Sequence, residues 1–460
     1  MSLIKSISGI RGTIGGKVND NLTPLDIVKF ASAFGTWLQN NKNKKDLTLV
    51  IGRDARISGQ MVSSLVTSTL QGLGINVVDL GLSTTPTVEI MVPELKADGG
   101  IILTASHNPK QWNALKLLND KGEFISGENG AEVLALAENE DFDYAEVDDL
   151  GKYETRDDAF DIHIKQILDL PTVDVEAIKA KKFKVVLDAV NSTGGISIPP
   201  LLEKLGVEVV KLYCEPNGQF PHNPEPLKEH LGDICELVIK EKADMGIVVD
   251  PDVDRLALVD EKGEMFGEEY TLVAVADYLL KDKKGVAISN LSSSRALRDV
   301  AKNLDSEYFA SAVGEVNVVT LMKEKNAVIG GEGNGGIIYP ELHYGRDSLV
   351  GVALFLTHLA KENKTVSELR ATYPSYFMGK KKIELTPDID VDALLIKVQE
   401  EYKNEEISTV DGVKIDFPEN WVHLRKSNTE PIIRIYTEAF SQEEADKLGD
   451  DMITKIRSLI

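Results

Sequence analysis

Cysteine and positive charge are both scarce in this sequence. Only Cys214 and Cys235 occur among 460 residues, too few for a disulfide framework or a zinc ribbon. The 51 Lys and Arg residues are outnumbered by 74 Asp and Glu residues, and the formal net charge is −23. We therefore expect a protein of a reducing, cytoplasmic setting that does not bind nucleic acid. A local cluster of Arg and Lys would still bind an anionic small molecule.

Long apolar runs and two common catalytic motifs are missing as well. The longest apolar stretch, near residues 350–360, is too short to span a bilayer, and the start MSLIKSISGIRG has no apolar signal region. We therefore expect no membrane partner. The chain contains neither a G-x-S-x-G elbow nor the Gly-Lys-Ser/Thr of a Walker loop. A triad built on Ser106 and His107 is disfavoured because adjacent side chains of an extended segment diverge.

The order of apolar segments predicts the fold class. Short Val- and Ile-rich runs alternate with helix-period segments in three successive stretches, which indicates βα units on mixed, mostly parallel sheets. After about Phe377 the pattern changes to antiparallel strands and a closing helix. We expect an α/β protein with three similar mixed-sheet α/β domains and a C-terminal α+β domain, with boundaries at 1–152, 153–260, 261–376 and 377–460.

The segment GIVVDPDVDR carries the most specific chemistry. Asp250, Asp252 and Asp254 alternate after an apolar strand, so their carboxylates point to one side and require a cation. Three oxygen ligands with coordination positions left over favour Mg²⁺. A calcium-binding EF-hand loop is rejected because Arg255 stands where that loop needs glycine and both flanks are strand-like. A solvated acidic turn remains the alternative.

The segment TASHNPKQWNALK follows another apolar strand. Ser106 is either the opening of a helix cap, a role that Asn108 could share, or an exposed serine that carries chemistry. Lys116 lies a few residues further on. Arg255 is suited to pairing with a phosphate, although a surface strand arginine would look the same.

Two further loops offer recognition groups. GGEGNGG allows a ligand close to the backbone, with Glu332 and Asn334 as its hydrogen-bonding side chains, although a flexible turn is the alternative. RKSNTEPIIR resembles a dianion cradle more than a hydrophilic hairpin turn. Arg11 stands between glycines in SGIRG, whereas GRDARISG more simply builds structure by tying a strand end to a helix that begins at Ser58. The cradle residues are Arg425, Ser427, Asn428, Thr429 and Arg434.

Together these groups are suited to phosphoryl transfer. Ser106 would carry the phosphate, whose oxygens complete a Mg²⁺ shell, and Lys116 and Arg255 would neutralise charge. SGIRG, TASHNPKQWNALK, DPDVDR, GEGNGG and RKSNTEP, in this order and spacing, resemble the α-D-phosphohexomutase family over essentially the full length. Within that family the chain is most similar to phosphoglucosamine mutases of the archaeal-like branch, and phosphomannomutase/phosphoglucomutase relatives share nearly every feature.

The resemblance implies a mechanism. Four domains would surround a central cleft. Ser106 would be phosphorylated and would hold Mg²⁺ with the aspartates, Glu332 would bind sugar hydroxyls, and the cradle would hold the non-reacting phosphate. Hexose 6-phosphate and hexose 1-phosphate would interconvert through a sugar 1,6-bisphosphate. The sugar phosphate, most simply glucosamine 6-phosphate, would be the partner of a monomer or homodimer.

The resemblance leaves the proton-transfer groups and the substrate open. Asn334 and Gly336 replace the Ser and His of a common Glu-x-Ser-Gly-His version of the sugar loop, and Glu315 stands where another loop often has histidine. Lys116, Arg255, Glu315 and His107 therefore all remain candidates for acid and base. A phosphomannomutase/phosphoglucomutase, a metal-dependent sugar phosphatase and a sugar-phosphate-binding regulator are the alternative functions.

Overall fold

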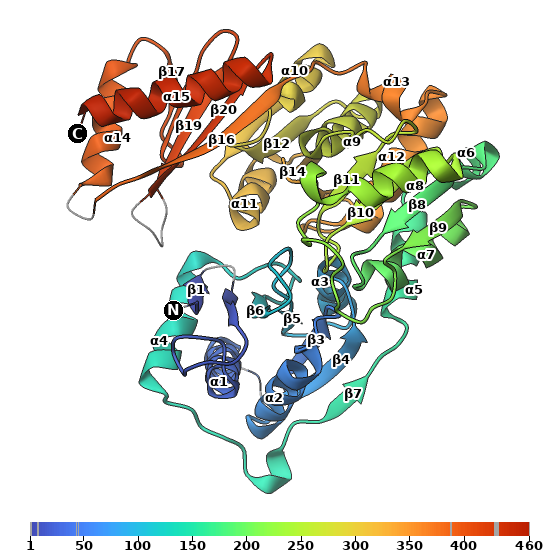
Figure 1. Cartoon of the computed structure of the whole chain (residues 1–460). Helices are drawn as coiled ribbons and strands as arrows, with labels where there is room; N and C mark the ends of the chain where they lie inside the picture. Colours follow the sequence, from blue (N-terminus) through green and yellow to red (C-terminus); the bar gives the residue numbers. More distant parts are fainter. Residues whose placement is uncertain are drawn as a thin grey trace. The chain divides into compact units, whose positions relative to one another are not determined.

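The computed structural model describes residues 2–6, 9–42, 44, 46–386, 389–426 and 432–459. Figure 1 follows the chain from blue at the N-terminus to red at the C-terminus. The chain forms two compact units, one made of Met1–Thr271 with Gly335–Leu369 and the other of Leu272–Asn334 with Arg370–Ile460. The finer division into four domains at the expected boundaries stays a prediction.

A seven-stranded mixed sheet forms the N-terminal part of the first unit. Its strand order is β1-β2-β6-β5-β3-β4-β7. The pairs β5–β3, β3–β4 and β4–β7 are parallel. The pairs β1–β2, β2–β6 and β6–β5 are antiparallel. The strands are β1 (Ile4–Ser6), β2 (Gly9–Thr13), β3 (Thr48–Arg53), β4 (Asn76–Leu82), β5 (Gly99–Leu103), β6 (Trp112–Leu118) and β7 (Tyr153–Thr155).

Both faces of this sheet are buried because its central strands β5 and β3 place apolar side chains on each face. Successive side chains of a strand point to opposite faces. Leu49 and Ile51 of β3 pack in the cluster that contains Phe34 of α1, whereas Val50 packs in the cluster that contains Val88 of α3. The helices in this part are α1 (Pro24–Asn41), α2 (Gly59–Gly72), α3 (Thr85–Glu94) and α4 (Gly127–Asn139).

Ser58 precedes α2, as the sequence predicts, but its role differs. Its side chain makes no cap hydrogen bond to the helix. Ser58 Oγ instead accepts from Asn113 Nδ2 at 2.9 Å. The serine thus ties the helix start to β6, which continues from the Ser106 loop.

A second sheet in the first unit carries the aspartate loop. Its order is β11-β10-β8-β9, parallel except for the antiparallel pair β10–β11. The loop from Asp250 to Arg255 is therefore the turn of a hairpin whose two strands are fully buried. The strands are β8 (Lys184–Asp188), β9 (Glu208–Leu212), β10 (Met245–Val249) and β11 (Leu256–Val259), and the helices are α5 (Ala159–Leu168), α6 (Val175–Lys181), α7 (Gly194–Lys204) and α8 (Gly232–Glu241), with the short turns η1 (Val147–Asp149) and η2 (Lys228–His230).

The most apolar stretch of the chain forms α12 (Ser348–Glu362), which follows β15 (Gly336–Ile338). Asp347 begins this helix, since its Oδ1 accepts from the N–H groups of Leu349 and Val350 at 2.7 and 3.2 Å. The ring of Phe355 packs edge-on against the ring of Phe266, with 5.3 Å between the ring centroids. Both rings are fully buried, so the helix lies in the core. Within the described part of the chain, no helix has the length and apolar character needed to cross a membrane.

The second unit combines a parallel α/β part with an antiparallel sheet. Strand β12 pairs in parallel with β13 and β14, and the C-terminal sheet has the antiparallel order β16-β20-β19-β18-β17. Helix α15 packs on β16 and β20 and runs along the C-terminal sheet in Figure 1. These observations confirm the expected fold class. The strands are β12 (Val286–Asn290), β13 (Glu307–Ser311), β14 (Ile329–Glu332), β16 (Phe377–Glu384), β17 (Glu406–Ser408), β18 (Val413–Asp416), β19 (Trp421–Lys426) and β20 (Ile432–Ala439), and the helices are α10 (Ala296–Asn303), α11 (Glu315–Lys325), α14 (Val391–Glu401) and α15 (Gln442–Leu459). Helices α9 (Glu268–Asp282) and α13 (Val366–Arg370) each span a boundary, along the sequence, between the residues of the two units.

Candidate active site

Ser106 lies in the turn between the antiparallel strands β5 and β6. Its backbone is left-handed, with φ +48°, a conformation that costs free energy in any residue other than glycine. Ser106 Oγ donates to Asp250 Oδ2 at 2.8 Å. The prediction of an exposed serine is wrong, because only 8% of the residue is accessible. The loop therefore directs the hydroxyl into the protein, onto the aspartate loop.

His107 lies closer to Ser106 than the sequence predicts. The expectation that the two side chains diverge is wrong, because Ser106 Oγ lies 3.3 Å from His107 Nδ1. The cause is the left-handed backbone at Ser106, which is not the extended segment assumed. Burial, with the nearby charge of Arg255, lowers the pKa of His107 to about 2. The imidazole is thus neutral at pH 7 and a weak base.

The three aspartates converge in the β10–β11 turn. Asp250, Asp252 and Asp254 are fully buried, and each offers one carboxylate oxygen within 4.8 Å of the others. Asp250 Oδ1 accepts from the backbone N–H groups of Asp254 and Arg255 at 3.1 and 3.2 Å. The turn therefore curls back on its own first carboxylate and gathers three negative charges.

Two cationic side chains offset these charges. Lys116 Nζ lies 2.8 Å from Asp252 Oδ2 and 3.7 Å from Asp254 Oδ2, and Arg346 Nη2 lies 2.6 Å from Asp254 Oδ2. Burial and the repulsion of its two neighbours raise the pKa of Asp250. Although burial opposes it, the Lys116 ammonium holds the pKa of Asp252 well below its usual range. Burial likewise opposes the charged form of Lys116, yet the aspartates raise its pKa.

The free oxygens of the aspartates fit a divalent cation. Thr85 Oγ1 and Lys116 bind Asp252 Oδ2, and Arg346 binds Asp254 Oδ2. In the described structure, Oδ1 of Asp252 and Oδ1 of Asp254 are buried without a hydrogen-bond partner. Buried anionic oxygens without partners are costly, and a hard cation with oxygen ligands satisfies them. The donor set therefore suits a bound metal ion.

The remaining predicted residues of the first unit flank this centre. Arg255 Nη1 lies 3.6 Å from Glu225 Oε1, and its Nε is buried without a hydrogen-bond partner among the described residues. Arg11 Nη1 lies 3.5 Å from Asn108 Oδ1, at the limit of a hydrogen bond. Arg11 belongs to β2, which pairs with β6. Both arginines thus lie beside the loops that carry Ser106 and the aspartates.

Glu332 ends β14 in the second unit. Only 6% of the residue is accessible, and its Oε1 accepts from Asn290 Nδ2 at 3.0 Å and from the N–H of Gly314 at 3.2 Å. Asn334 follows two residues later and is half-buried. Glu315, which begins α11, comes directly after Gly314, whose φ is +115°. The Gly314 turn thus connects the two glutamates that the sequence singles out.

Arg425 and Arg434 face each other as register partners on β19 and β20. Arg425 Nε donates to Asp411 Oδ2 at 2.8 Å, and the same oxygen accepts from the N–H of Val313 at 3.0 Å. Ser427, Asn428 and Thr429 lie outside the described residues. The second unit therefore carries two cradle arginines on neighbouring strands, one of them oriented by a carboxylate.

His423 precedes Arg425 by two residues on β19. It is fully buried between Ser292 Oγ, at 2.9 Å from Nδ1, and the carbonyl oxygen of Asp411, at 2.6 Å from Nε2. A carbonyl only accepts, so Nε2 carries the proton and Nδ1 accepts from the serine. Burial lowers the pKa of His423 to about 4.

Sequence analysis missed two groups of this site. Thr85, at the start of α3, and Arg346, immediately before the cap of α12, both bind the metal-loop carboxylates. The sequence signals of a helix start, Thr84 before Pro86 and Asp347 before an apolar run, locate both segments. They contain no signal of the long-range contact with Asp252 or Asp254.

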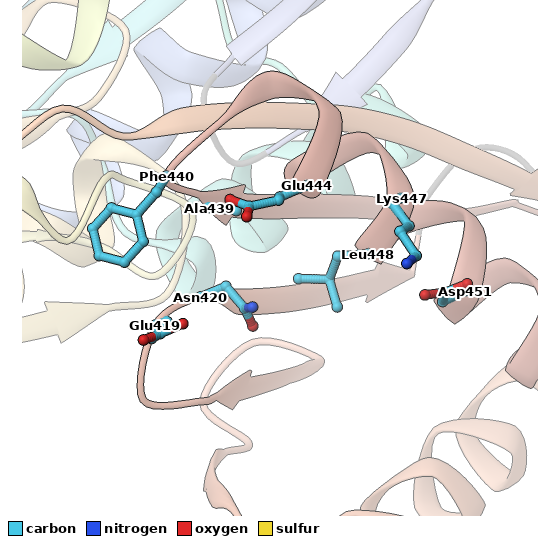
Figure 2. Close-up of a pocket in the computed structure, with 8 residues that line it drawn as sticks. All are labelled: Glu419, Asn420, Ala439, Phe440, Glu444, Lys447, Leu448 and Asp451. Atoms are coloured by element: carbon cyan, nitrogen blue, oxygen red, sulfur yellow. The ribbon is translucent and has the colours of Figure 1, made fainter.

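A surface hollow in the second unit contains none of these residues. Figure 2 shows it between the start of β19, the end of β20 and α15. Phe440, which is 52% exposed, lies at one end, and Lys447 lies toward the other. The lining residues are Glu419, Asn420, Ala439, Phe440, Glu444, Lys447, Leu448 and Asp451.

Comparison with known sequences accounts for nearly the whole chain. Four consecutive segments match the domains described as Phosphoglucomutase/phosphomannomutase: alpha/beta/alpha domain I at residues 4–144, domain II at 161–263, domain III at 267–376 and the C-terminal domain at 381–455. The chain belongs to this family. The protein is accordingly a phosphohexomutase, an isomerase, and the resemblance inferred from its motifs is confirmed.

Individual members of the phosphohexomutase family show the same full-length likeness. A phosphoglucomutase/phosphomannomutase of Thermococcus kodakarensis is 38% identical over 94% of this chain and 95% of its own. A phosphoglucosamine/phosphogalactosamine mutase of Sulfurisphaera tokodaii is 32% identical over 98% of both chains. The crystal structure of a phosphoglucomutase/phosphomannomutase family protein from Burkholderia thailandensis, 25% identical, superposes with a TM-score of 0.85 over 99% of this chain and 98% of that one.

The geometry of the aspartate loop predicts that the protein binds a divalent metal ion there. We expect the chelator-treated protein to bind Mg²⁺ or Mn²⁺ and to melt at a higher temperature when the ion is added, because a ligand of the native state stabilises it. Asp254→Asn removes the negative charge of one expected ligand. Loss of a residue that only hydrogen-bonds to a ligand typically weakens metal binding about 10–100-fold, and we expect Asp254→Asn to weaken it more than that. Isothermal titration calorimetry measures the affinity. Asp157→Asn, at an exposed aspartate, is the matched control, and equal affinities of the two variants would contradict the site.

His423 gives the second unit a pH dependence of defined sign. Its pKa of about 4 lies below the 6.5 of an ordinary histidine, so between these values the unfolded chain binds a proton that the folded chain does not. The free energy of unfolding therefore falls as the pH drops from 6.5 to 4. Urea titrations at several pH values measure this slope. In His423→Gln the slope over this window becomes shallower, and an unchanged slope would contradict the assignment.

Proposed function

We propose that this phosphohexomutase interconverts glucosamine 6-phosphate and glucosamine 1-phosphate through a phosphoserine at Ser106. The observation that carries the proposal is the 2.8 Å hydrogen bond from Ser106 Oγ to Asp250. Asp250 is one of three clustered buried aspartates, and the other two each have an oxygen without a hydrogen-bond partner among the described residues. A serine held against a metal-binding set is suited to carry a group whose charge the metal offsets.

The reaction consists of two transfers. In the first, the bond between phosphorus and Ser106 Oγ breaks while a bond forms to a sugar hydroxyl oxygen, and the hydroxyl proton leaves to a base. The resulting sugar 1,6-bisphosphate reverses its orientation. In the second, its other phosphate returns to Ser106 Oγ, and a proton returns to the sugar oxygen. The same bisphosphate activates enzyme that has lost its serine phosphate.

Mg²⁺ would be held by Asp250, Asp252, Asp254 and the Ser106 phosphate, where it would offset the charge of the transferring group. Lys116 keeps its positive charge at neutral pH, because the aspartates raise its pKa. Lys116 and Arg255 are proposed to lower the charge at the reacting phosphate. Together with Glu315 and His107 they remain the candidates for proton transfer, with His107 the weakest base, since its pKa is about 2.

Substrate recognition is proposed to use the second unit and Arg11. The Glu332 carboxylate would accept hydrogen bonds from the sugar, and the Asn334 amide would both donate and accept them. The non-reacting phosphate would bind the cradle, where bidentate arginine contacts add geometric selectivity. We expect this small sugar phosphate to be the partner of a cytoplasmic monomer or homodimer. The proposed cradle residues are Arg425, Ser427, Asn428, Thr429 and Arg434.

The choice of sugar has two supported candidates. The Sulfurisphaera relative is named a phosphoglucosamine/phosphogalactosamine mutase, which favours an amino sugar. The Thermococcus relative, with the higher identity of 38%, is named a phosphoglucomutase/phosphomannomutase, which favours a neutral hexose. Glu332 and Glu315 favour the amino sugar, because a carboxylate binds an ammonium more strongly than a hydroxyl.

Ser106→Ala is expected to abolish mutase turnover while leaving the fold and sugar-phosphate binding intact. Without Oγ there is no atom to carry the phosphate. Enzyme treated with ³²P-labelled hexose 1,6-bisphosphate should contain one labelled phosphate per wild-type chain and none per variant chain. Ser64→Ala, an exposed serine of α2, is the matched control.

Two outcomes of this experiment would favour the other functions. A labelled wild type that releases only inorganic phosphate would identify a phosphatase. A wild type that binds sugar phosphate without incorporating label would identify a binding regulator. Near-normal turnover of Ser106→Ala would contradict the phosphoserine.

The substrate is tested by comparing kcat/KM for glucosamine, mannose and glucose 6-phosphates with a trace of the matching bisphosphate. We expect the amino sugar to exceed the others by about 10-fold or more, since losing a charge-assisted hydrogen bond costs on the order of 1.5–3 kcal/mol. A preference for mannose or glucose 6-phosphate would select the phosphomannomutase/phosphoglucomutase alternative.

A further inference from the structure

Arg56 is a buried arginine that contacts the Ser106 loop with nearly its whole guanidinium group. Only 1% of the residue is accessible. A guanidinium has five N–H donors, and here each has an acceptor. One, from Nε, binds Asp54 Oδ2 at 3.0 Å. The other four bind backbone carbonyl oxygens of the serine loop: Ser106 and Asn108 from Nη2, and Pro109 and Trp112 from Nη1.

The backbone N–H of Ser106 is linked to the same two charged residues, Asp54 and Arg56. The N–H of Ser106 donates to Thr104 Oγ1 at 2.9 Å, and Thr104 Oγ1 donates to Asp54 Oδ2 at 2.6 Å. Asp54 in turn binds Arg56 through both its backbone N–H and its Nε. A closed ring of hydrogen bonds therefore runs from the N–H of Ser106 through Thr104, Asp54 and Arg56 to the carbonyl of Ser106.

This ring holds a backbone conformation that Ser106 would not adopt by preference. A left-handed residue other than glycine costs on the order of 1–3 kcal/mol and persists only where its surroundings fix it. The φ of +48° also brings Oγ to 2.8 Å from Asp250 Oδ2. If Ser106 relaxed to an ordinary conformation, its side chain would leave this direction.

The Arg56 turn is also connected to the metal loop. Ser192 Oγ accepts from the N–H of Ala55 at 3.3 Å and donates to the carbonyl of Pro251, between two of the aspartates, at 2.7 Å. The ring of Phe220 covers the guanidinium at 5.2 Å. The same turn therefore fixes the serine and is tied to the aspartates that face it.

We propose that Arg56 is a positioning residue of the mutase: by binding four carbonyls of the serine loop it keeps Ser106 left-handed and its Oγ, or the phosphate on it, aligned with the aspartate loop. The inference rests on the proposed phosphoserine function. Only arginine fits this role, because lysine has three donors on a single nitrogen and does not span four carbonyls.

Arg56→Lys tests the proposal. We expect kcat to fall by about 100-fold, the effect of a displacement of about 1 Å at a reacting group, while KM for the sugar phosphate changes less than about 3-fold. Transfer of label from the phosphorylated enzyme to sugar slows in proportion, measured by rapid quench. Arg53→Lys, three residues earlier and bonded to Gln60 Oε1 and the Asp54 carbonyl, is the matched control and should retain wild-type kcat.

Thr104→Val keeps the proposal testable if Arg56→Lys fails to fold. It removes the hydroxyl that joins the Ser106 N–H to Asp54 without changing the side-chain shape, so it should lower kcat in the same direction with little change in KM. Folding of each variant is checked by circular dichroism and thermal melting. Folded Arg56→Lys or Thr104→Val with wild-type kcat overturns the proposal, as does an equal loss in Arg53→Lys. If the wild type itself takes no label from the bisphosphate, it is the proposed function that fails.

Discussion

The concentration of three carboxylates in one buried turn is the constraint on which the site depends. Like charges at this separation repel strongly when water is excluded. The protein offsets them with Lys116 and Arg346, each from a different segment of the first unit, and no described residue donates to Oδ1 of Asp252 or of Asp254. The two cationic side chains bind one oxygen of each of these carboxylates, and the other oxygen is suited to a metal ion. The surrounding fold is thus built to bring distant cations to one turn.

The proposed phosphoserine would account for the four carbonyl hydrogen bonds that Arg56 makes to the serine loop. A transferring phosphate would have to stay aligned with the charges that stabilise it, since catalysis of this kind consists mainly of positioning and electrostatics. The serine loop belongs to the seven-stranded sheet and the aspartate loop to the second sheet of the first unit. The buried apolar strands β5, β10 and β11 fix the positions at which these loops begin or end. Ser192 then joins the N–H of Ala55, in the turn that carries Arg56, to the carbonyl of Pro251 in the aspartate loop.

The sequence predicts the fold class and the loop at each strand end because these follow from local periodicity and from compact motifs. Asp250, Asp252 and Asp254 are recognisable because alternation along one strand end gathers them without any tertiary information. Arg346 and Thr85 are not, since their contacts join segments far apart in the chain. The proximity of His107 to Ser106 depends on the left-handed backbone at Ser106. Serine gives no sequence signal of that conformation, unlike glycine. The sequence predicts a structural role for the GRDARISG segment that contains Arg56. It does not predict which backbone carbonyls Arg56 binds.

Asp411 has a consequence for how the second unit would bind the proposed sugar phosphate. One carboxylate oxygen binds both Arg425 and the N–H of Val313, and the next residue, Gly314, donates to Glu332. In the proposed function, a phosphate bound to Arg425 would therefore act on the turn that orients Glu332, and a sugar bound to Glu332 would act on Arg425. Such linkage is reciprocal by thermodynamic necessity. Under this proposal the two ends of one sugar phosphate would bind cooperatively. A phosphate without its sugar, or a sugar without its phosphate, would bind only one of the two linked groups.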